Sequence, residues 1–323
     1  MAQVNLGNGN LLLTGNDGVL NGAGIALRND RFYNGLSTTD GSYGAGWSSS
    51  LSQVDIGLDV TSTEAKFRGP TGFTATFTKS GTTWKAPNGF NATLTENASS
   101  TDQRYTLQYN SSGEKISFST SGYITKDTDR NNIGSSYTYG TDGRINSILT
   151  ASGRQYLINW AGVTDNHIAS VVDGAGRTIQ YDRNAQGQLS RVTKPGSNFE
   201  DYTYDSSGRV ATAKMTGTDQ GDLVFTFGYD TSHKVTSISS ALASAPGTEL
   251  SKTTYTYTSG LTKITDGRGN VTEHTIDSGG KVTAVKDALG RSRSASFTTN
   301  NNVATTTDAL GAGSTPGNVT TYS

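Results

Sequence analysis

The sequence of 323 residues contains no cysteine, which excludes structural disulfides, thiolate nucleophiles and thiolate metal sites. Its longest aliphatic run is Leu11–Leu13, so no segment is apolar enough over sufficient length to cross a membrane. The start, Met1–Gln3, has no basic stretch and no apolar core behind it, so no signal peptide is expected. Dense basic runs are also missing and the net charge is -1, which argues against nucleic-acid binding.

Apolar residues make up only 32% of the sequence and charged residues only 16%, while glycine occurs 40 times. Thr, Ser, Tyr, Asn and Gly fill the remainder, and this mixture favours strands joined by tight turns. No amphipathic stretch of helical length occurs. Because only alternate side chains of a half-exposed strand are buried, such a chain needs few apolar residues. The composition therefore predicts an all-β fold with little or no helix.

Turn signals and short alternating segments follow one another along the whole chain. Phe73–Phe77 and Tyr105–Tyr109 each place their aromatic residues on one face of a predicted strand. Glycine accepts the positive φ angles that hairpin turns require. Asn-Gly pairs stand at 21–22, 34–35 and 88–89, and Asp-Gly pairs at 17–18, 40–41, 142–143, 173–174 and 266–267.

Two elements repeat. The first is a Tyr-x-Tyr-like strand, a polar turn and a returning β-branched or leucine residue. It occurs at Leu107–Ile116, Tyr137–Ile145, Tyr181–Leu189, Tyr202–Val210, Phe227–Val235, Tyr255–Leu261 and Ile276–Val282. The second is Asp-x-x-Gly followed by Arg or Asn, at Asp173–Arg177, Asp266–Asn270 and Asp287–Arg291, with another start at Asp308–Gly311. Successive tyrosines 181, 204, 229 and 257 lie 23, 25 and 28 residues apart. Spacings of this size indicate stacked repeats, each about two hairpins, that bury their aromatic faces only against their neighbours.

The return strands carry apolar residues three positions apart, as in Ile145 and Ile148 or Val282 and Val285. In a regular strand these side chains would face opposite ways. Either a β-bulge brings them to one face or both faces are covered, and both alternatives fit the sequence. The recurrent arginines are expected to cap turns and pair with nearby aspartates; they are Arg144, Arg154, Arg177, Arg209 and Arg291.

The first 120 residues repeat less regularly and contain Trp47 and Trp84. We interpret residues 1–120 as an entry segment of β-strands and residues 121–323 as the repeat array. No proline- or serine-rich linker separates the two parts.

The repeats resemble those of the Rhs/YD-repeat family of bacterial toxins, with relatives among teneurins and insecticidal toxin complexes. The resemblance rests on Tyr204–Val210, on Tyr181-Asp182 with Gly187, on Tyr229-Asp230 and on Asp287–Arg291. The opening is similar to the family's leader segment at Val4-Asn5, Gly9–Leu11, Arg31–Asn34 and Gly44–Trp47. The residues expected to carry the repeat are Tyr139, Gly143, Arg144, Tyr181, Asp182, Gly187, Tyr204, Asp205, Gly208, Arg209, Tyr229, Asp230, Tyr257, Asp287, Gly290 and Arg291.

The resemblance implies a strip of antiparallel hairpins wound into a spiral, part of a secreted or cell-surface shell around a C-terminal toxin domain. The expected partners are the remainder of that shell and its cargo. No counterpart of the family's self-cleaving segment is found, and the last residues, Thr320–Ser323, fall inside a repeat. A section of a larger protein is therefore expected. Gly140 and Thr258 stand where the family has aspartate, and His233 stands near the place of a turn glycine.

No enzyme, cofactor or metal site is predicted. His167, His233 and His274 show no metal-ligand spacing, and no Gly-x-Ser-x-Gly motif marks a nucleophile, although a triad assembled in space stays open. Asp127–Asn132 resembles the start of a calcium loop but lacks its glycine and glutamate, so a turn is favoured. Gly22–Gly24 and Gly44–Gly46 are interpreted as turns rather than nucleotide loops.

The repeated tyrosines allow two interpretations. They either fill the space between hairpins, which is the favoured interpretation, or stack on sugars at an exposed surface. A structural shell segment is the main functional hypothesis, and a carbohydrate- or cell-surface-binding module is the alternative. A glycosidase would need paired carboxylates, and the sequence nominates none. Open sheet edges also predict self-association.

Overall fold

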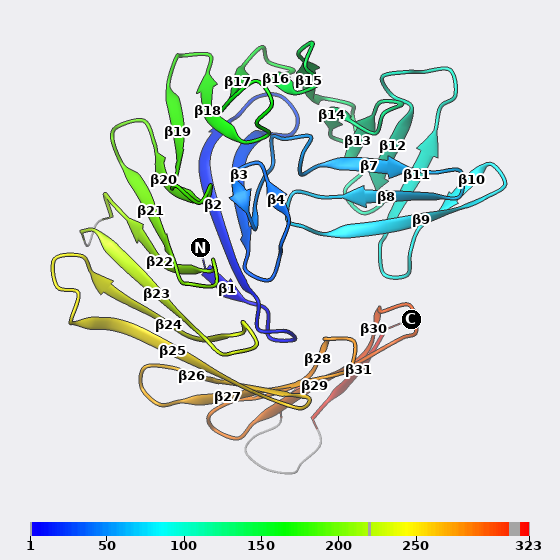
Figure 1. Ribbon diagram of the computed structural model, residues 1–323. Helices are drawn as coiled ribbons and strands as arrows, with labels where there is room; N and C mark the ends of the chain where they lie inside the picture. The colour runs from blue at the N-terminus through cyan, green and yellow to red at the C-terminus, as the bar shows by residue number, and fades with distance from the viewer. Residues whose placement is uncertain (1, 219–220, 310–316, 323) are drawn as a thin grey trace. The chain divides into compact units, whose positions relative to one another are not determined.

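The computed structural model describes residues 2–218, 221–309 and 317–322 (Figure 1). Within these ranges every regular element is a β-strand, which confirms the predicted all-β class. None of the described residues belongs to a helix that could cross a membrane. Leu310 and Gly311 of the predicted Asp308–Gly311 element lie outside the described residues, as do Met1 and Ser323.

The leader strands form three small sheets. The first contains β1 (Ala2–Val4), β2 (Leu11–Leu20), β3 (Leu27–Asn34) and β6 (Trp47–Ser49), in that order. A two-stranded hairpin follows from β4 (Asp40–Gly41) and β5 (Gly44–Ala45). The third sheet has the order β10 (Thr83–Lys85), β9 (Thr74–Ser80), β8 (Glu64–Arg68) and β7 (Gly57–Val60).

All later strands belong to one antiparallel sheet of 21 strands, in which each strand lies between its neighbours in sequence. This order is what successive short hairpins produce, because a two- to five-residue turn can join only adjacent antiparallel strands. The first ten strands are β11 (Ala92–Glu96), β12 (Tyr105–Tyr109), β13 (Lys115–Phe118), β14 (Ile124–Thr128), β15 (Gly134–Tyr139), β16 (Ile145–Thr150), β17 (Gln155–Trp160), β18 (Ile168–Asp173), β19 (Thr178–Arg183) and β20 (Leu189–Thr193). The remaining ones are β21 (Phe199–Tyr204), β22 (Val210–Met215), β23 (Leu223–Tyr229), β24 (Val235–Leu242), β25 (Glu249–Thr258), β26 (Leu261–Thr265), β27 (Val271–Ile276), β28 (Val282–Lys286), β29 (Ser292–Phe297), β30 (Val303–Thr307) and β31 (Val319–Thr321).

The spacing of apolar residues by three is explained by β-bulges. In the β15–β16 pair, Ile148 lies opposite Tyr137, but the register then shifts so that Ile145 lies opposite Tyr139. Both isoleucines are fully buried. Equivalent shifts place Leu189 opposite Arg183, Val235 opposite Tyr229 and Val282 opposite Ile276. The bulge alternative is therefore correct: one extra residue on the returning strand turns both apolar side chains to the same face.

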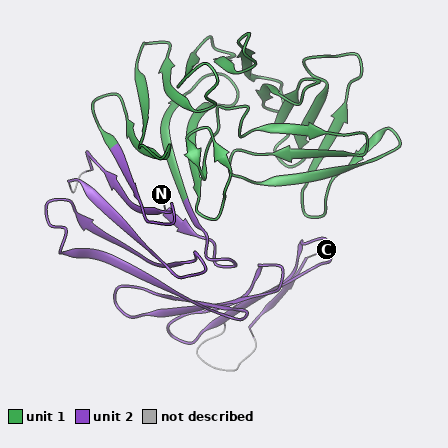
Figure 2. Cartoon of the chain, in the orientation of Figure 1, with its two compact units in different colours: residues 1, 13–199 green, residues 2–12, 200–323 purple. Residues whose placement is uncertain are grey.

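The chain divides into two compact units, coloured separately in Figure 2. Unit 1 contains Leu13–Phe199, and its core includes Trp47, Phe67 and Phe118 from different sheets. Unit 2 contains Ala2–Leu12 and Glu200–Ser323, and Leu11 and Val235 are fully buried in it. These units follow three-dimensional contacts, whereas the predicted boundary near residue 120 follows repeat regularity and stays a prediction.

Candidate functional site

Several repeat turns are each held by one carboxylate, as the Asp205 turn illustrates. Asp205 Oδ1 accepts hydrogen bonds from the backbone N–H groups of Ser207 and Arg209, at 2.9 and 3.0 Å. Asp205 Oδ2 accepts from Arg209 Nε at 2.7 Å, and Gly208 between them has a φ of 79°. This Asx turn is local, so the sequence alone can encode it. The same arrangement recurs at Asp173, Asp230, Asp266, Asp277 and Asp287, so both repeated elements are the same kind of turn.

Four described turns place a residue other than glycine at the left-handed position, and two of these are turns held by an aspartate. His233 has a φ of 65° in the Asp230 turn, and Asn132 has a φ of 63° in the Asp129 turn. Asp129 Oδ1 accepts the N–H groups of Asn131 and Ile133, so the segment that resembles a calcium loop is the end of β14 followed by a turn. Asp129 is thereby engaged with the backbone.

Neighbouring repeats are joined by an inter-hairpin contact, which consists of an aromatic ring, a carbonyl and a cation. Tyr229 donates its hydroxyl to the carbonyl oxygen of Val210 at 2.7 Å. The guanidinium of Arg209, from the same preceding hairpin, lies 4.4 Å from the centre of the Tyr229 ring, and its Nη1 donates to the carbonyl of Asp230. A cation over an aromatic face is stabilising, and here it links two successive turns.

The inter-hairpin contact recurs with different side chains. Tyr257 donates to Val235 O at 2.7 Å under Lys234, and Tyr139 donates to Ile124 O at 2.6 Å. Trp160 Nε1 donates to Ile145 O at 2.8 Å, and Arg144 lies 5.3 Å from its ring. The sequence analysis did not include Trp160 because its hairpin lacks the Tyr-Asp pair, and the glycine of its turn, Gly162, has no positive φ angle. The structure thus favours the interpretation of the tyrosines as links between hairpins.

The predicted repeat residues are distributed as follows. Gly143, Gly187 and Gly290 all have positive φ angles. Four of the recurrent arginines pair with a turn aspartate, but Arg154 forms no ion pair within the described residues and uses its N–H to bond Thr150. Tyr204 is half-buried in β21. For Tyr181-Asp182 the predicted register is wrong, because Asp182 is an exposed strand residue and Asn184 Oδ1 accepts the turn N–H groups of Gln186 and Gln188.

We expect Asp205→Ala to lower the free energy of unfolding by about 1–2 kcal/mol, because it removes two backbone acceptors and the partner of Arg209. Asp182→Asn, at an exposed strand position, serves as the matched control and should change stability by less than about 0.5 kcal/mol. Urea denaturation followed by circular dichroism measures both. Equal effects of the two substitutions would contradict the role assigned to the turn aspartate.

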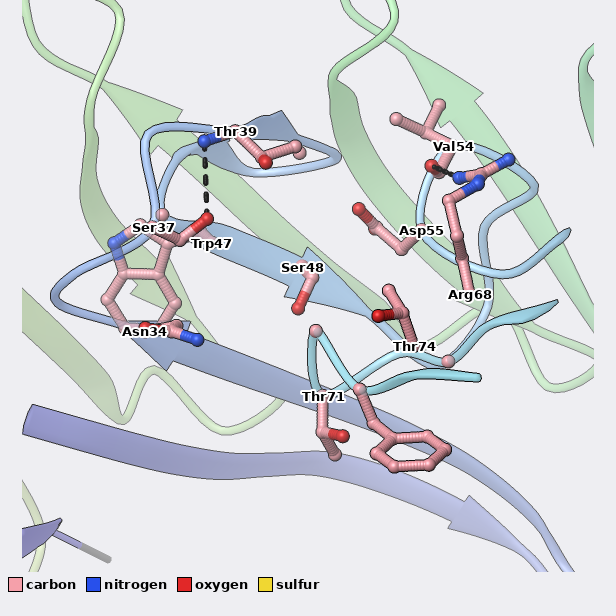
Figure 3. A pocket seen from close by; sticks show the side chains of 15 residues that line it. Asn34, Ser37, Thr39, Trp47, Ser48, Val54, Asp55, Arg68, Thr71 and Thr74 are labelled. Atoms are coloured by element: carbon pink, nitrogen blue, oxygen red, sulfur yellow. Dashed lines mark hydrogen bonds between the residues drawn. The ribbon is translucent and has the colours of Figure 1, made fainter. Parts of the chain in front are cut away.

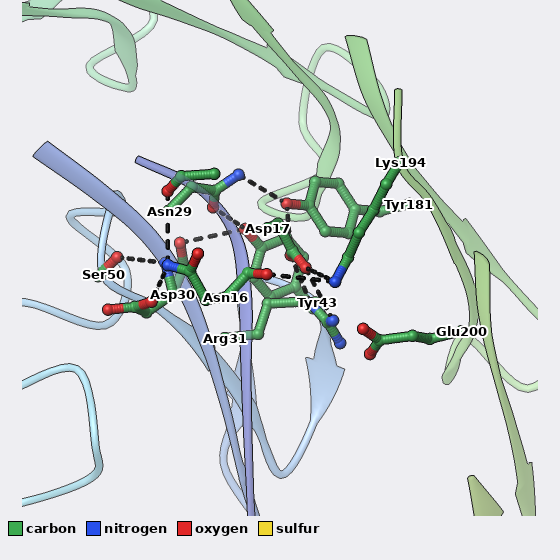
Figure 4. Close-up of polar contacts among 12 residues, drawn as sticks. Asn16, Asp17, Asn29, Asp30, Arg31, Tyr43, Ser50, Tyr181, Lys194 and Glu200 are labelled. Carbon is green, nitrogen blue, oxygen red and sulfur yellow. Dashed lines mark hydrogen bonds and ion pairs between the residues drawn. The ribbon is translucent and has the colours of Figure 1, made fainter. Parts of the chain in front are cut away.

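A buried polar cluster joins the leader strands to the repeats within unit 1 (Figure 4). Arg31 on β3 pairs with Asp17 on β2 through Nε–Oδ2 and Nη2–Oδ1 contacts of 2.5 and 2.9 Å, and both side chains are inaccessible to solvent. Tyr181 on β19 donates its hydroxyl to Asp17 Oδ2 at 3.0 Å. Lys194 Nζ lies 3.4 Å from Asp17 Oδ1. Asp17 therefore gathers two cations and one hydroxyl around a side chain that is inaccessible to solvent.

The cluster continues through Asn29, which donates to the Tyr181 hydroxyl at 2.9 Å and accepts from the Tyr43 hydroxyl at 3.3 Å. Burial, reinforced by the charge of Asp17, raises the pKa of Tyr43 and of Tyr181 far above the usual range. Both phenols stay protonated and act as hydrogen-bond donors. The polar atoms of the cluster therefore bond one another across β2, β3 and β19, which ties these strands together.

A cavity of about 160 Å³ lies among β3, β6, β8 and β9 (Figure 3). Its walls include Asn34, Trp47, Asp55 and Arg68. Burial raises the pKa of Asp55 to about 6, against hydrogen bonds from the N–H groups of Ser42 and Ser49 that favour the carboxylate. Arg68 is bound to Asp59 and to the carbonyl of Val54. The Asp55 carboxylate is thus held by backbone donors from the β4–β5 turn and from the end of β6.

The three histidines occupy different settings. His167 lies between two carboxylates, with Nδ1 2.5 Å from Asp165 Oδ1 and Nε2 2.9 Å from Asp40 Oδ1, and no hydroxyl of the described chain bonds it. That arrangement is an imidazole hydrogen-bonded between two carboxylates, and it differs from a Ser-His-Asp triad. His233 is the exposed turn residue, and His274 lies in β27. In the part of the chain that the structure describes, no group of three His, Cys, Asp or Glu side chains could hold a metal.

One carboxylate is poorly satisfied. Asp127 Oδ1 is buried and has no hydrogen-bond partner among the described residues. Burial, with a smaller contribution from the charge of Glu114, raises the pKa of Asp127 to about 7. The folded state therefore holds the Asp127 proton more tightly than the unfolded chain does. This contribution to stability is complete below about pH 4 and is lost as the pH rises through about 7.

We expect Asp127→Asn to remove that pH dependence. The variant should exceed the wild type in stability by roughly 1–3 kcal/mol at about pH 8, and the difference should shrink towards zero near pH 4. Urea denaturation at about pH 4, 6 and 8 measures the difference, with Asp182→Asn as control. If the difference in stability between variant and wild type does not change with pH, Asp127 is ionised in the folded protein at all three pH values.

Comparison with known proteins yields one family match. The model of a domain of unknown function, DUF6531, matches residues 2–77. This range covers the leader strands whose Arg31 anchors the repeats. The match and the repeats support an Rhs/YD-repeat-like family. No curated protein matches the chain.

Several solved structures resemble this YD-repeat-like chain at a distance. A crystal structure of TcdB2-TccC3 is 11% identical, with coverage of 76% of this chain and 19% of that one and a TM-score of 0.36. A Photorhabdus luminescens Tc holotoxin pore is 9% identical, with coverage of 95% and 18% and a TM-score of 0.44. A porin-like protein from Bacteroides uniformis is 15% identical, with coverage of 53% and 79% and a TM-score of 0.29. The chain spans about a fifth of the length of the first two, and likenesses of this size carry no functional conclusion.

Proposed function

We propose that this chain is a structural wall section of a secreted YD-repeat toxin, which encloses or presents a C-terminal toxin domain. The observation that carries the proposal is the inter-hairpin contact, which recurs from Ile124 to Tyr257. A contact copied along many hairpins builds an extended sheet, whereas a catalytic site needs a single, differentiated cluster.

The repeated polar groups support a non-enzymatic role because the structure already employs them. The Asp205 carboxylate holds its turn, the Tyr229 hydroxyl bonds a neighbouring carbonyl, and the Arg209 guanidinium contacts both hairpins. The buried Asp17–Arg31 pair is likewise saturated. We infer that the partners are the rest of the wall and its cargo, that the location is extracellular, and that residues 1–120 are the entry to an array over 121–323.

Limited proteolysis of the natural protein that carries this chain tests the proposal. Ile148→Asp places a charge in the fully buried face of β16 and should open the wall. We expect new cleavage sites, identified by mass spectrometry, in sequence outside residues 1–323, while Asp182→Asn leaves the cleavage pattern unchanged. If the opened and intact proteins expose the same external sites, the wall role is wrong. Saturable hydrolysis by the purified chain that one substitution abolishes would also overturn it.

Carbohydrate binding is a second candidate, favoured by one stacked aromatic pair of which one ring is exposed. Tyr123, which is 43% exposed, stacks on Tyr139 with ring centres 5.5 Å apart and an interplanar angle of 14°. Asp102 and Gln103 line the adjoining pocket and offer polar partners for sugar hydroxyls. Glycan-array binding that Tyr123→Ala abolishes and Tyr123→Phe preserves would support this function. An array without hits would exclude it.

A further inference from the structure

In unit 2 a glycine- and asparagine-rich segment lies along one face of the repeat sheet. The carbonyl oxygen of Gly9 accepts a hydrogen bond from the N–H of Val235 at 2.8 Å. The carbonyl of Leu6 accepts from Thr262 Oγ1 at 2.8 Å. A Cβ atom on Gly7 would lie 2.9 Å from the carbonyl oxygen of Gly280. The segment thus approaches the sheet by its backbone, and Gly7 allows the closest approach.

The same kind of contact occurs in unit 1. The N–H of Ile168 donates to the carbonyl of Ser42 at 2.8 Å, and the N–H of Ile145 donates to Gln53 Oε1 at 3.1 Å. Ile145, Ile168 and Val235 are all the first residue of a returning strand, at the position where the register shifts. A bulge frees one N–H from the regular ladder, and in these three repeats an oxygen from outside the sheet accepts it.

The covered face continues beyond the segment. Thr262 pairs with His274, and His274 pairs with Val285, so the three side chains share one face of β26, β27 and β28. Thr262, under Leu6, is 3% exposed, but Val285 is only half-buried and Val303 in β30 is 40% exposed. A groove on this face is lined by Val282, Val285 and Ala295. The apolar side chains of this face therefore extend beyond the part that Leu6–Gly9 covers.

Polar groups on the uncovered part lack outside partners. Val282 and Val303 stand at register shifts equivalent to that of Val235. Within residues 2–218, 221–309 and 317–322, no atom from outside their sheet bonds either N–H. His274 Nδ1, next to Val285 on this face, is buried without a hydrogen-bond partner among the same residues. The face thus combines apolar side chains, two backbone donors and the ring nitrogen Nδ1 of His274.

We propose that the face of β28–β30 binds an extended polypeptide segment rich in glycine and asparagine, as β24–β27 bind Leu6–Gly9. The backbone carbonyls of this segment accept the N–H groups of Val282 and Val303, and one of its N–H groups donates to His274 Nδ1. Glycine permits the close approach, as Gly7 does against Gly280. This inference rests on the printed contacts of one face and does not depend on the wall role.

The probe is a fluorescein-labelled synthetic peptide with the sequence of Ala2–Leu12. The chain's own copy is tethered, so its high effective concentration keeps the covered face occupied and leaves only the open face to the free peptide. We expect saturable anisotropy changes with the full chain. Val282→Asp and Val285→Asp should weaken binding at least tenfold, because they place a charge in the apolar groove. Thr275→Asp, an exposed position of the neighbouring β27, should leave binding unchanged.

A change in the peptide avoids any question of altered folding of the protein. Replacing the amide after Gly9 by an ester makes its carbonyl a weaker acceptor, and we expect about three- to tenfold weaker binding. No saturable binding, or equal loss in the control variant, overturns the proposal. Sedimentation that shows a dimer which Val282→Asp disrupts would identify a second copy of the chain as the occupant and would also overturn it.

Discussion

Replacing Arg31 by methionine is expected to lower the free energy of unfolding by about 3–5 kcal/mol. Methionine fills much of the same volume, so the loss comes from the charge rather than from a cavity. Asp17 would remain inaccessible to solvent with its two strongest hydrogen bonds removed. Lys194, at 3.4 Å, and the Tyr181 hydroxyl compensate only in part. Because the cluster joins β2 and β3 to β19, the Arg31→Met substitution should destabilise all of unit 1.

A double-mutant cycle separates the ion pair from packing. Asp17→Asn alone leaves Arg31 as the buried unpaired charge and should cost a similar amount. The double variant Asp17→Asn with Arg31→Met removes both charges. Its loss in free energy of unfolding should be smaller than the sum of the two single losses by at least about 2 kcal/mol. Arg28→Met is the control, because Arg28 is 53% exposed in its pair with Asp30 and should cost less than about 1 kcal/mol. Additive effects at Asp17 and Arg31 would contradict the coupling.

The second large effect is expected at Ile148. Ile148 is fully buried in β16, so Ile148→Ala should lower the free energy of unfolding by about 2–5 kcal/mol. Val285, at the equivalent place in β28, is only half-buried, and Val285→Ala should cost less than about 1 kcal/mol. The two residues have the same place in the repeat, so a difference beyond the roughly 1 kcal/mol expected for the extra methylene of isoleucine measures how well each face is covered.

Guanidinium denaturation of both variants, followed by tryptophan fluorescence and circular dichroism, tests this contrast. The two units can unfold separately, so each variant is assigned to the transition that it shifts. A loss at Val285 as large as that at Ile148 would mean that the face of β28 is covered in solution. That result would also count against an open docking face.

The local parts of the fold could be predicted from the sequence. In Asp205–Val210 the carboxylate, the glycine and the returning valine lie within six residues, and every bond of the turn joins neighbours. Such turns repeat, and short turns join only adjacent antiparallel strands, so the all-β strip follows. The same reasoning failed at Asp182, where a Tyr-Asp pair stands two residues before the true turn residue, Asn184. A pair of residues is too short a pattern to define register without its glycine spacing.

The remaining features depend on residues far apart in sequence. No sequence pattern predicts the contact of Asp17 with Arg31 and Tyr181, since 164 residues separate Asp17 from Tyr181. Trp160 replaces the repeat tyrosine because any aromatic donor that reaches the carbonyl of Ile145 serves there. Sequence by itself determined the strands, the turns and their repetition, because those rest on hydrogen bonds between near neighbours. Only the tertiary structure decided which repeats the leader covers and which face stays open, because burial depends on what packs against a strand.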